Sequence, residues 1–159
     1  MLGSTRDTTK RVWRADAAEA RARQVYLLLQ HVSGELIHEL ATVLKPASIT
    51  PEQYQVLRIL WSAGSAGIAL SAVAERSPSG DPDVTRLLDR LERQGLATRT
   101  RETPDRRVVT ARITGAGRRL VEKLDKPVSM LHARQFAELG EGNLRELRRL
   151  LDKLATPAR

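Results

Sequence analysis

Apolar residues recur at three- and four-residue steps along most of the chain, which is the periodicity of amphipathic helices. Between these stretches stand proline, glycine and short polar runs that favour helix ends and turns. The pattern predicts a mainly helical fold with six helical stretches. They cover residues 15–45, 50–64, 70–76, 81–95, 114–138 and 143–156.

The stretch 15–45 is long for a chain of 159 residues, and Lys45–Pro46 ends it because a residue before proline disfavours helical geometry. Much of its apolar face exceeds what one subunit of this size can bury. We therefore expect a partner chain, and a homodimer is the economical form. Residues 1–14 are polar and are expected to be a disordered tail.

Two short extended stretches, 96–101 and 108–113, flank a charged, turn-forming segment and predict a β-hairpin. Helix, short helix, helix and hairpin in this order are typical of a winged helix-turn-helix lobe, here over residues 50–113. The fold class is thus mainly α with a small β-hairpin wing (α+β). Residues 15–45 and 114–156 are expected to be dimerisation helices of the same intertwined domain.

Charge favours a polyanionic partner. The chain has 27 Lys and Arg against 19 Asp and Glu, a net charge of +8. Ten arginines and six acids lie between Asp81 and Arg119, so half of the net charge falls on the helix and hairpin that would face DNA. Double-stranded DNA is therefore the expected partner.

Other classes find little support. The chain has no cysteine, which excludes disulfides and thiol-based sensing. No apolar run approaches the ~18 residues of a membrane span and no signal peptide is apparent, so a cytoplasmic protein without membrane association is expected. No nucleophile–base pair, phosphate-binding glycine loop or metal-ligand spacing rises above chance. We expect no enzyme, no cofactor and no metal site.

The segment from Pro82 to Leu96, PDVTRLLDRLERQGL, resembles the recognition helix and exit turn of MarR-family transcriptional regulators. Asp105-Arg106-Arg107 is similar to the family's wing-tip motif at the expected distance, and further likenesses extend over residues 25–154. The resemblance implies a two-fold dimer joined by its first and last helices. It also implies a pseudo-palindromic operator and, often, release by a small molecule.

Carried over by position, the resemblance places Pro82, Asp83 and Arg86 at the start of the recognition helix, in the major groove. Thr85 and Arg90 face outward on the same helix. In the wing, Arg107 would enter the minor groove beside Arg106, with Asp105 holding the arginines in place. The acidic Asp83 departs from the family's usual Ser or Thr, which affects the expected operator sequence.

Each assignment has a structural alternative. Arg106 and Arg107 are alternatively a solvated turn, and Asp83 a first-turn acid that stabilises its helix. Arg86 is alternatively paired with Asp83 or Asp89, and Arg90 with an acid of the same helix.

An effector, if one exists, is expected between the dimer helices and the DNA-binding lobe. His31 and His38, seven residues apart on one helix, and Tyr54 and Trp61 are the candidate lining residues. Interface or surface histidines, and a core tryptophan, are the alternatives.

The sequence thus predicts a sequence-specific transcriptional regulator, a ligand-responsive repressor that binds DNA as a homodimer. The alternative is a non-enzymatic protein-interaction module, or a sequence-blind nucleic-acid binder, on a winged-helix scaffold.

Overall fold

The computed structural model describes the backbone of residues 5–77, 83–101 and 109–155, and the side chains within 17–77, 83–100 and 109–155. The chain divides into two compact units, residues 1–39 and residues 40–159. Pro82, Asp105, Arg106 and Arg107 lie outside the described residues.

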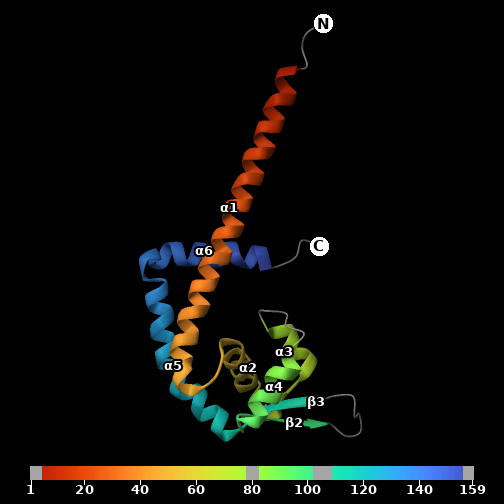
Figure 1. The fold of residues 1–159 in the computed structure, drawn as a ribbon, viewed down its shortest axis with the longest axis vertical. Helices are drawn as coiled ribbons and strands as arrows, with labels where there is room; N and C mark the ends of the chain where they lie inside the picture. Colours follow the sequence, from red (N-terminus) through yellow and green to blue (C-terminus); the bar gives the residue numbers. More distant parts are fainter. Residues whose placement is uncertain (1–4, 78–82, 102–108, 156–159) are drawn as a thin grey trace. The chain divides into compact units, whose positions relative to one another are not determined.

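Helix α1, Thr5–Leu44, forms nearly all of the first unit (Figure 1). It begins at Thr5, whereas the sequence pattern predicted a disordered tail up to residue 14. Residues 5–14 contain neither proline nor glycine, so a helix already formed further along extends toward the N-terminus without a breaker. The predicted end near Pro46 is confirmed, because a short 3₁₀ turn, Lys45–Ala47, follows α1.

Three helices of the second unit pack against one another: α2, Pro51–Ser62; α3, Leu70–Arg76; and α4, Val84–Arg93. A capping box fixes the start of α2. The Thr50 hydroxyl accepts from the Gln53 backbone N–H, and the Gln53 carboxamide accepts from the Thr50 backbone N–H at 2.9 Å. Gly95, with φ of +69°, ends α4 in the left-handed conformation that glycine adopts without strain.

The sheet has three antiparallel strands in the order β1–β3–β2. The predicted hairpin is confirmed as β2, Ala97–Arg101, paired with β3, Val109–Ile113, with Ala97 opposite Ile113 and Arg101 opposite Val109. Strand β1, Ile68–Ala69, adds to the other edge of β3, and the sequence pattern missed it because two residues are too few to show a period. The order leaves β2 as an edge strand.

Helix α5, Gly115–Gln135, follows the sheet directly and continues through Pro127. The Thr114 hydroxyl caps it by accepting from the Gly117 N–H at 3.1 Å. A 3₁₀ turn, Ala137–Leu139, leads into α6, Gly140–Ala155.

One apolar core joins the end of α1, helices α2 to α5 and the sheet, and within the described part of the chain it contains no residue of α6. Its fully buried members are Leu44, Val56, Leu57, Leu60, Val73, Leu88, Leu91, Ala111 and Val121. Large apolar side chains elsewhere are exposed: Val25, Tyr26, Leu27, Leu28, Val32 and Ile37 on α1, Met130 on α5, and Leu144, Leu150, Leu151 and Leu154 on α6. Exposed apolar stripes of this extent need a cover.

Candidate nucleic-acid interface

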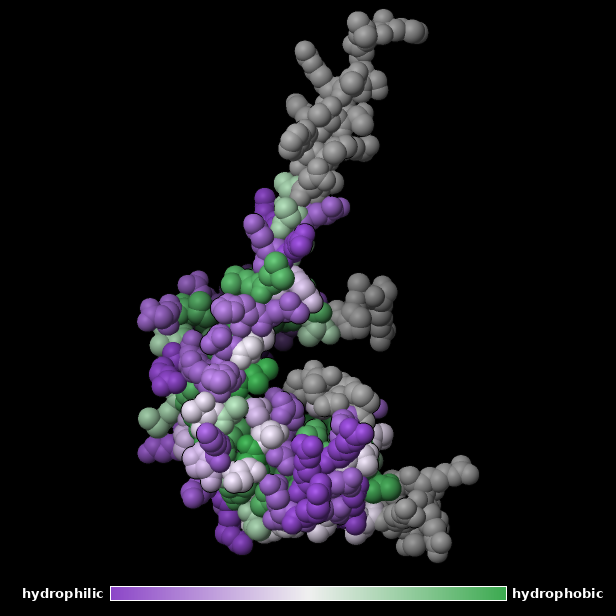
Figure 2. Space-filling view, viewed as in Figure 1, coloured by the Kyte–Doolittle hydropathy of each residue, from purple (hydrophilic) through white to green (hydrophobic). Residues whose placement is uncertain are grey.

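Helix α4 separates its apolar and cationic residues onto opposite sides. Val84, Leu87, Leu88 and Leu91 are buried, because a spacing of three and four residues places them on one face. Thr85, Arg86, Arg90 and Arg93 are exposed on the other side. Figure 2 shows hydrophilic side chains gathered on the viewed face of the lobe, over α4 and the strands beside it. The packing of α4 therefore fixes its outward cationic face.

At the start of α4, Asp83 occupies the N-cap position without a side-chain capping bond. Its carboxylate instead accepts from Arg86, with Nε and Nη1 each 3.3 Å from one of its oxygens. This is one of the pairings that the sequence left as an alternative for Arg86. The Arg86 side chain is 78% exposed, and an ion pair in such a position contributes little stability. The guanidinium can therefore exchange this partner for another acceptor.

The far end of α4 forms a second basic feature. Arg90 and Arg93, with Gln53 and Gln94, line an open hollow of about 310 Å³. The Gln94 carboxamide donates to the Ser48 carbonyl oxygen at 3.0 Å and so ties the end of α4 to the segment before α2. Two guanidinium groups beside such a hollow suit a phosphate oxygen.

The wing is described only up to its two strands. Across β2 and β3, the Arg112 Nη1 donates to the Thr100 hydroxyl at 2.5 Å. The tip residues Asp105, Arg106 and Arg107 lie outside the described residues, as does Pro82 before α4, so their roles stay predictions.

The candidate effector residues fall into two groups. On α2, Tyr54 is buried and belongs to the core, whereas Trp61 is 37% exposed and is not among the buried core residues of the single chain. His31 and His38 are exposed on the part of α1 that belongs to residues 1–39. An effector site formed by these residues stays a prediction.

Arg58, which sequence reasoning missed, connects the two α2 aromatics. Its guanidinium lies 5.3 Å from the Trp61 ring centroid and bonds Asp125 of α5 at 3.0 Å. Burial raises the pKa of the Tyr54 phenol above its ordinary value, an effect that the positive charge and hydrogen bond of Arg58 oppose. The spacing of Arg58, four residues after Tyr54 and three before Trp61, is the signal that was available.

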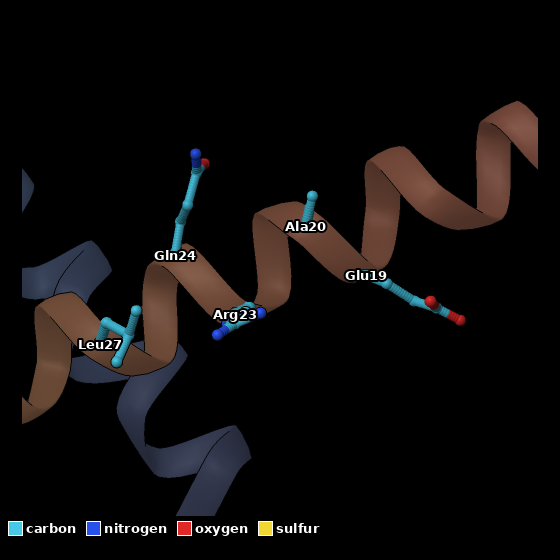
Figure 3. A pocket seen from close by; sticks show the side chains of 5 residues that line it. All are labelled: Glu19, Ala20, Arg23, Gln24 and Leu27. Carbon is cyan, nitrogen blue, oxygen red and sulfur yellow. The ribbon is translucent and has the colours of Figure 1, made fainter.

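A hollow on α1 offers no comparable site. Figure 3 shows that its lining side chains, Glu19, Ala20, Arg23, Gln24 and Leu27, project from successive turns of a single helix. Within the described residues no group of three or more potential metal-ligating side chains occurs, and no helix there is both long and apolar enough to cross a membrane.

Comparisons with known proteins agree on one family. The MarR family model matches residues 49–109, the span from just before α2 to the first residue of β3. The chain is 30% identical to the transcriptional repressor MdtR of Bacillus subtilis over 142 residues, which cover 89% of this chain and 90% of that protein.

Two solved structures extend the match. A mutant MarR from E. coli complexed with operator DNA gives a TM-score of 0.74 at 28% identity, over 81% of this chain and 91% of that one. CouR from Rhodococcus jostii RHA1, bound to p-coumaroyl-CoA, gives 0.73 at 28% identity, over 85% and 94%. Together with the winged lobe and its cationic helix, these matches show that the chain belongs to the MarR family of transcriptional regulators.

Proposed function

We propose that this protein is a homodimeric repressor that binds a pseudo-palindromic operator in double-stranded DNA and acts in the cytoplasm. Helix α4 reads base edges in the major groove, and the wing contacts the neighbouring backbone and minor groove. Pro82, Asp83, Thr85, Arg86 and Arg90 are the assigned contact residues of the helix, and Asp105, Arg106 and Arg107 those of the wing.

The observation that carries this proposal is the division of α4 into a buried apolar face and an exposed cationic face. The four buried residues of α4 pack into the core of the lobe. Thr85, Arg86 and Arg90 are exposed and are not part of that core. Asp83 can accept from cytosine N4, and Arg86 can donate to guanine. The hollow beside Arg90 and Arg93 offers a backbone phosphate contact.

The dimer is inferred from the exposed apolar residues of α1 and α6. Leu28 is 62% exposed and Leu154 is 71% exposed, and a helix with such a face is stabilised by covering it. We expect twice the chain mass in light scattering after gel filtration. Leu28→Glu should shift the protein toward the monomer, whereas Gln30→Glu, an exposed change close by, should not.

The E. coli MarR neighbour binds operator DNA and CouR binds p-coumaroyl-CoA, so we propose that a small molecule also regulates this protein. The cluster of Tyr54, Arg58 and Trp61 is the best candidate to sense an aromatic acid, with His31 and His38 as further candidates. In a Trp13→Phe variant Trp61 is the one tryptophan left, and its fluorescence should change when p-coumarate binds there.

Selection of bound duplexes from a randomised pool tests the proposal. An enriched inverted repeat, with half-sites about one helical turn apart, supports a dimeric sequence-specific regulator. Affinity without sequence enrichment would instead indicate a sequence-blind binder, and no affinity for any duplex would indicate a protein-interaction module.

The wing assignment has its own test. Arg106→Ala/Arg107→Ala should weaken binding and flatten its salt dependence, since each lost phosphate contact lowers the slope by about 0.9. Arg148→Ala/Arg149→Ala on α6 removes the same charge outside the proposed interface and should leave the slope unchanged. Wild-type affinity in the wing variant would contradict the assignment.

A further inference from the structure

The carboxylate of Glu92 in α4 contacts three nitrogen atoms of Arg99 in β2. The Glu92 carboxylate accepts from the Arg99 backbone N–H at 2.7 Å and from its Nε at 2.9 Å. The Arg99 Nη2 lies 2.7 Å from the same carboxylate. Since β2 is an edge strand, Glu92 satisfies a backbone donor on the edge that β3 does not cover.

The same guanidinium reaches a second acid of α4. The Arg99 Nη2 donates to Asp89 Oδ1 at 2.5 Å. One arginine of the strand therefore bonds two acids that lie three residues apart on one side of α4. The Arg99 side chain is only 24% exposed, which makes these bonds stronger than those of a surface pair. Hydrogen bonding by Glu92 raises the pKa of Arg99, against the opposing effect of burial, so the group stays charged.

The beginning of β2 and α4 both contribute residues to the buried core, whereas Arg99 and Thr100 further along the strand are not core residues. Ala97 and Leu91 belong to the buried core. Further along the strand than Ala97, Arg99 and Thr100 border an open cleft of about 400 Å³. Thr85 and Glu92 of α4 lie on the other side of this cleft. Pairing with β3 and the bonds of Arg99 to Glu92 and Asp89 hold this part of the strand, and the latter join it to α4. From this part of the strand the chain continues into the wing tip.

We infer that Arg99 is a positioning residue for DNA binding. It sets the place of β2, and hence of the wing, relative to α4, so that helix and wing reach the duplex together. Its single positive charge also offsets part of the negative charge of Asp89 and Glu92, on a helix that faces phosphate. The role does not need a DNA contact by Arg99 itself, because its Nε and Nη2 already bond Glu92 and Asp89. The inference rests on the proposed function.

Two substitutions separate position from charge. Arg99→Gln removes the charge and the forked donors. Arg99→Lys keeps the charge but lacks the planar fork that bonds Glu92 and Asp89 at once. Arg145→Gln is the matched control, because it removes one arginine and its ion pair with Glu141 on exposed α6. The DNA affinities of the wild type and of these three variants are compared at temperatures well below their unfolding midpoints. Each protein is titrated on the selected operator duplex and on a scrambled duplex at several salt concentrations.

We expect about a tenfold loss of operator affinity in both Arg99 variants and none in Arg145→Gln. The scrambled duplex should lose affinity as well, because the wing's phosphate contacts do not depend on sequence. In Arg99→Lys the salt slope should also become shallower although the charge is unchanged, because wing phosphates are no longer contacted. Faster hydrogen exchange at the backbone N–H groups of residues 99–101 should accompany both changes.

Wild-type affinity in Arg99→Lys together with a loss in Arg99→Gln would overturn the inference, since charge alone would then explain the effect. Unchanged affinity or unchanged hydrogen exchange in both variants would overturn it as well. If the wild-type protein itself prefers no duplex, the proposed function fails and the role of Arg99 falls with it. If Arg99→Gln does not fold, Arg99→Lys and Glu92→Gln, which keeps an acceptor for the backbone N–H, carry the same comparison.

Discussion

Gly117, in the first turn of α5, gives a sharp test of the packing between the hairpin and the helix that follows it. A Cβ at this position would lie 2.2 Å from the Leu96 carbonyl oxygen and 2.7 Å from the Ile113 Cγ1. The Leu96 carbonyl oxygen cannot easily move, because it accepts from the Thr114 backbone N–H at 3.1 Å. Gly117→Ala therefore forces backbone to shift where the wing joins α5.

Two effects of opposite sign decide the outcome. Alanine is more favourable than glycine in a helix by up to about 1 kcal/mol. Overpacking against backbone costs about 1–3 kcal/mol or more. Because the nearest neighbour is a carbonyl oxygen at 2.2 Å, the second effect should dominate. After the helix gain is subtracted from the overpacking cost, we expect Gly117→Ala to lower the free energy of unfolding by about 1–2 kcal/mol.

Gly115, two residues earlier in the same turn, is the matched control. A Cβ there meets only the flexible end of Arg119, with Nη1 at 3.5 Å. Gly115→Ala should be neutral or stabilise the protein by up to about 1 kcal/mol. Urea denaturation at one fixed protein concentration measures both changes, since the stability of a dimer depends on concentration. A Gly117→Ala protein as stable as Gly115→Ala would refute the reasoning.

Three further predictions concern α2, α4 and α5. Leu88→Ala should cost about 2–5 kcal/mol of unfolding free energy, because Leu88 is fully buried, and an unchanged urea midpoint would contradict its core position. Burial raises the pKa of Tyr54 above 10.0, so the folded state keeps a proton that the unfolded state loses there, and stability should fall as pH rises from about 10 toward the raised pKa. Tyr54→Phe should unfold with a weaker pH dependence between about pH 9 and 11, and equal slopes in the two proteins would refute this cause. Asp125→Asn breaks the exposed pair with Arg58 and should cost less than about 1 kcal/mol, with a smaller difference in high salt; a larger loss would mean that the pair is coupled to the α2 aromatics.

Helix periodicity, capping residues and turn residues were sufficient to predict most helices and strands of the fold. The Thr50 capping box, the Gly95 helix end and the Thr114 cap are formed by residues close in sequence. These helix ends can therefore be predicted without knowledge of tertiary contacts. The hairpin strands followed from their composition and the charged turn between them. Strand β1 was not predicted, because its two residues form a strand only by pairing with β3.

The candidate interface divides in the same way. The sequence alone placed Thr85, Arg86 and Arg90 on the outer side of α4, because the helical period and the buried leucines leave no other orientation. It also offered Asp83 as a partner for Arg86, three residues away on the same helix.

Only the tertiary structure decided what Arg58 and Arg99 do. Their acid partners lie on other elements: Arg58 bonds Asp125, 67 residues away, and Arg99 bonds Asp89 and Glu92 across the turn at Gly95. Which of several acids pairs with an arginine depends on the packing of helices and strands against one another. Periodicity fixes the face on which a side chain lies, whereas the fold fixes what that face meets.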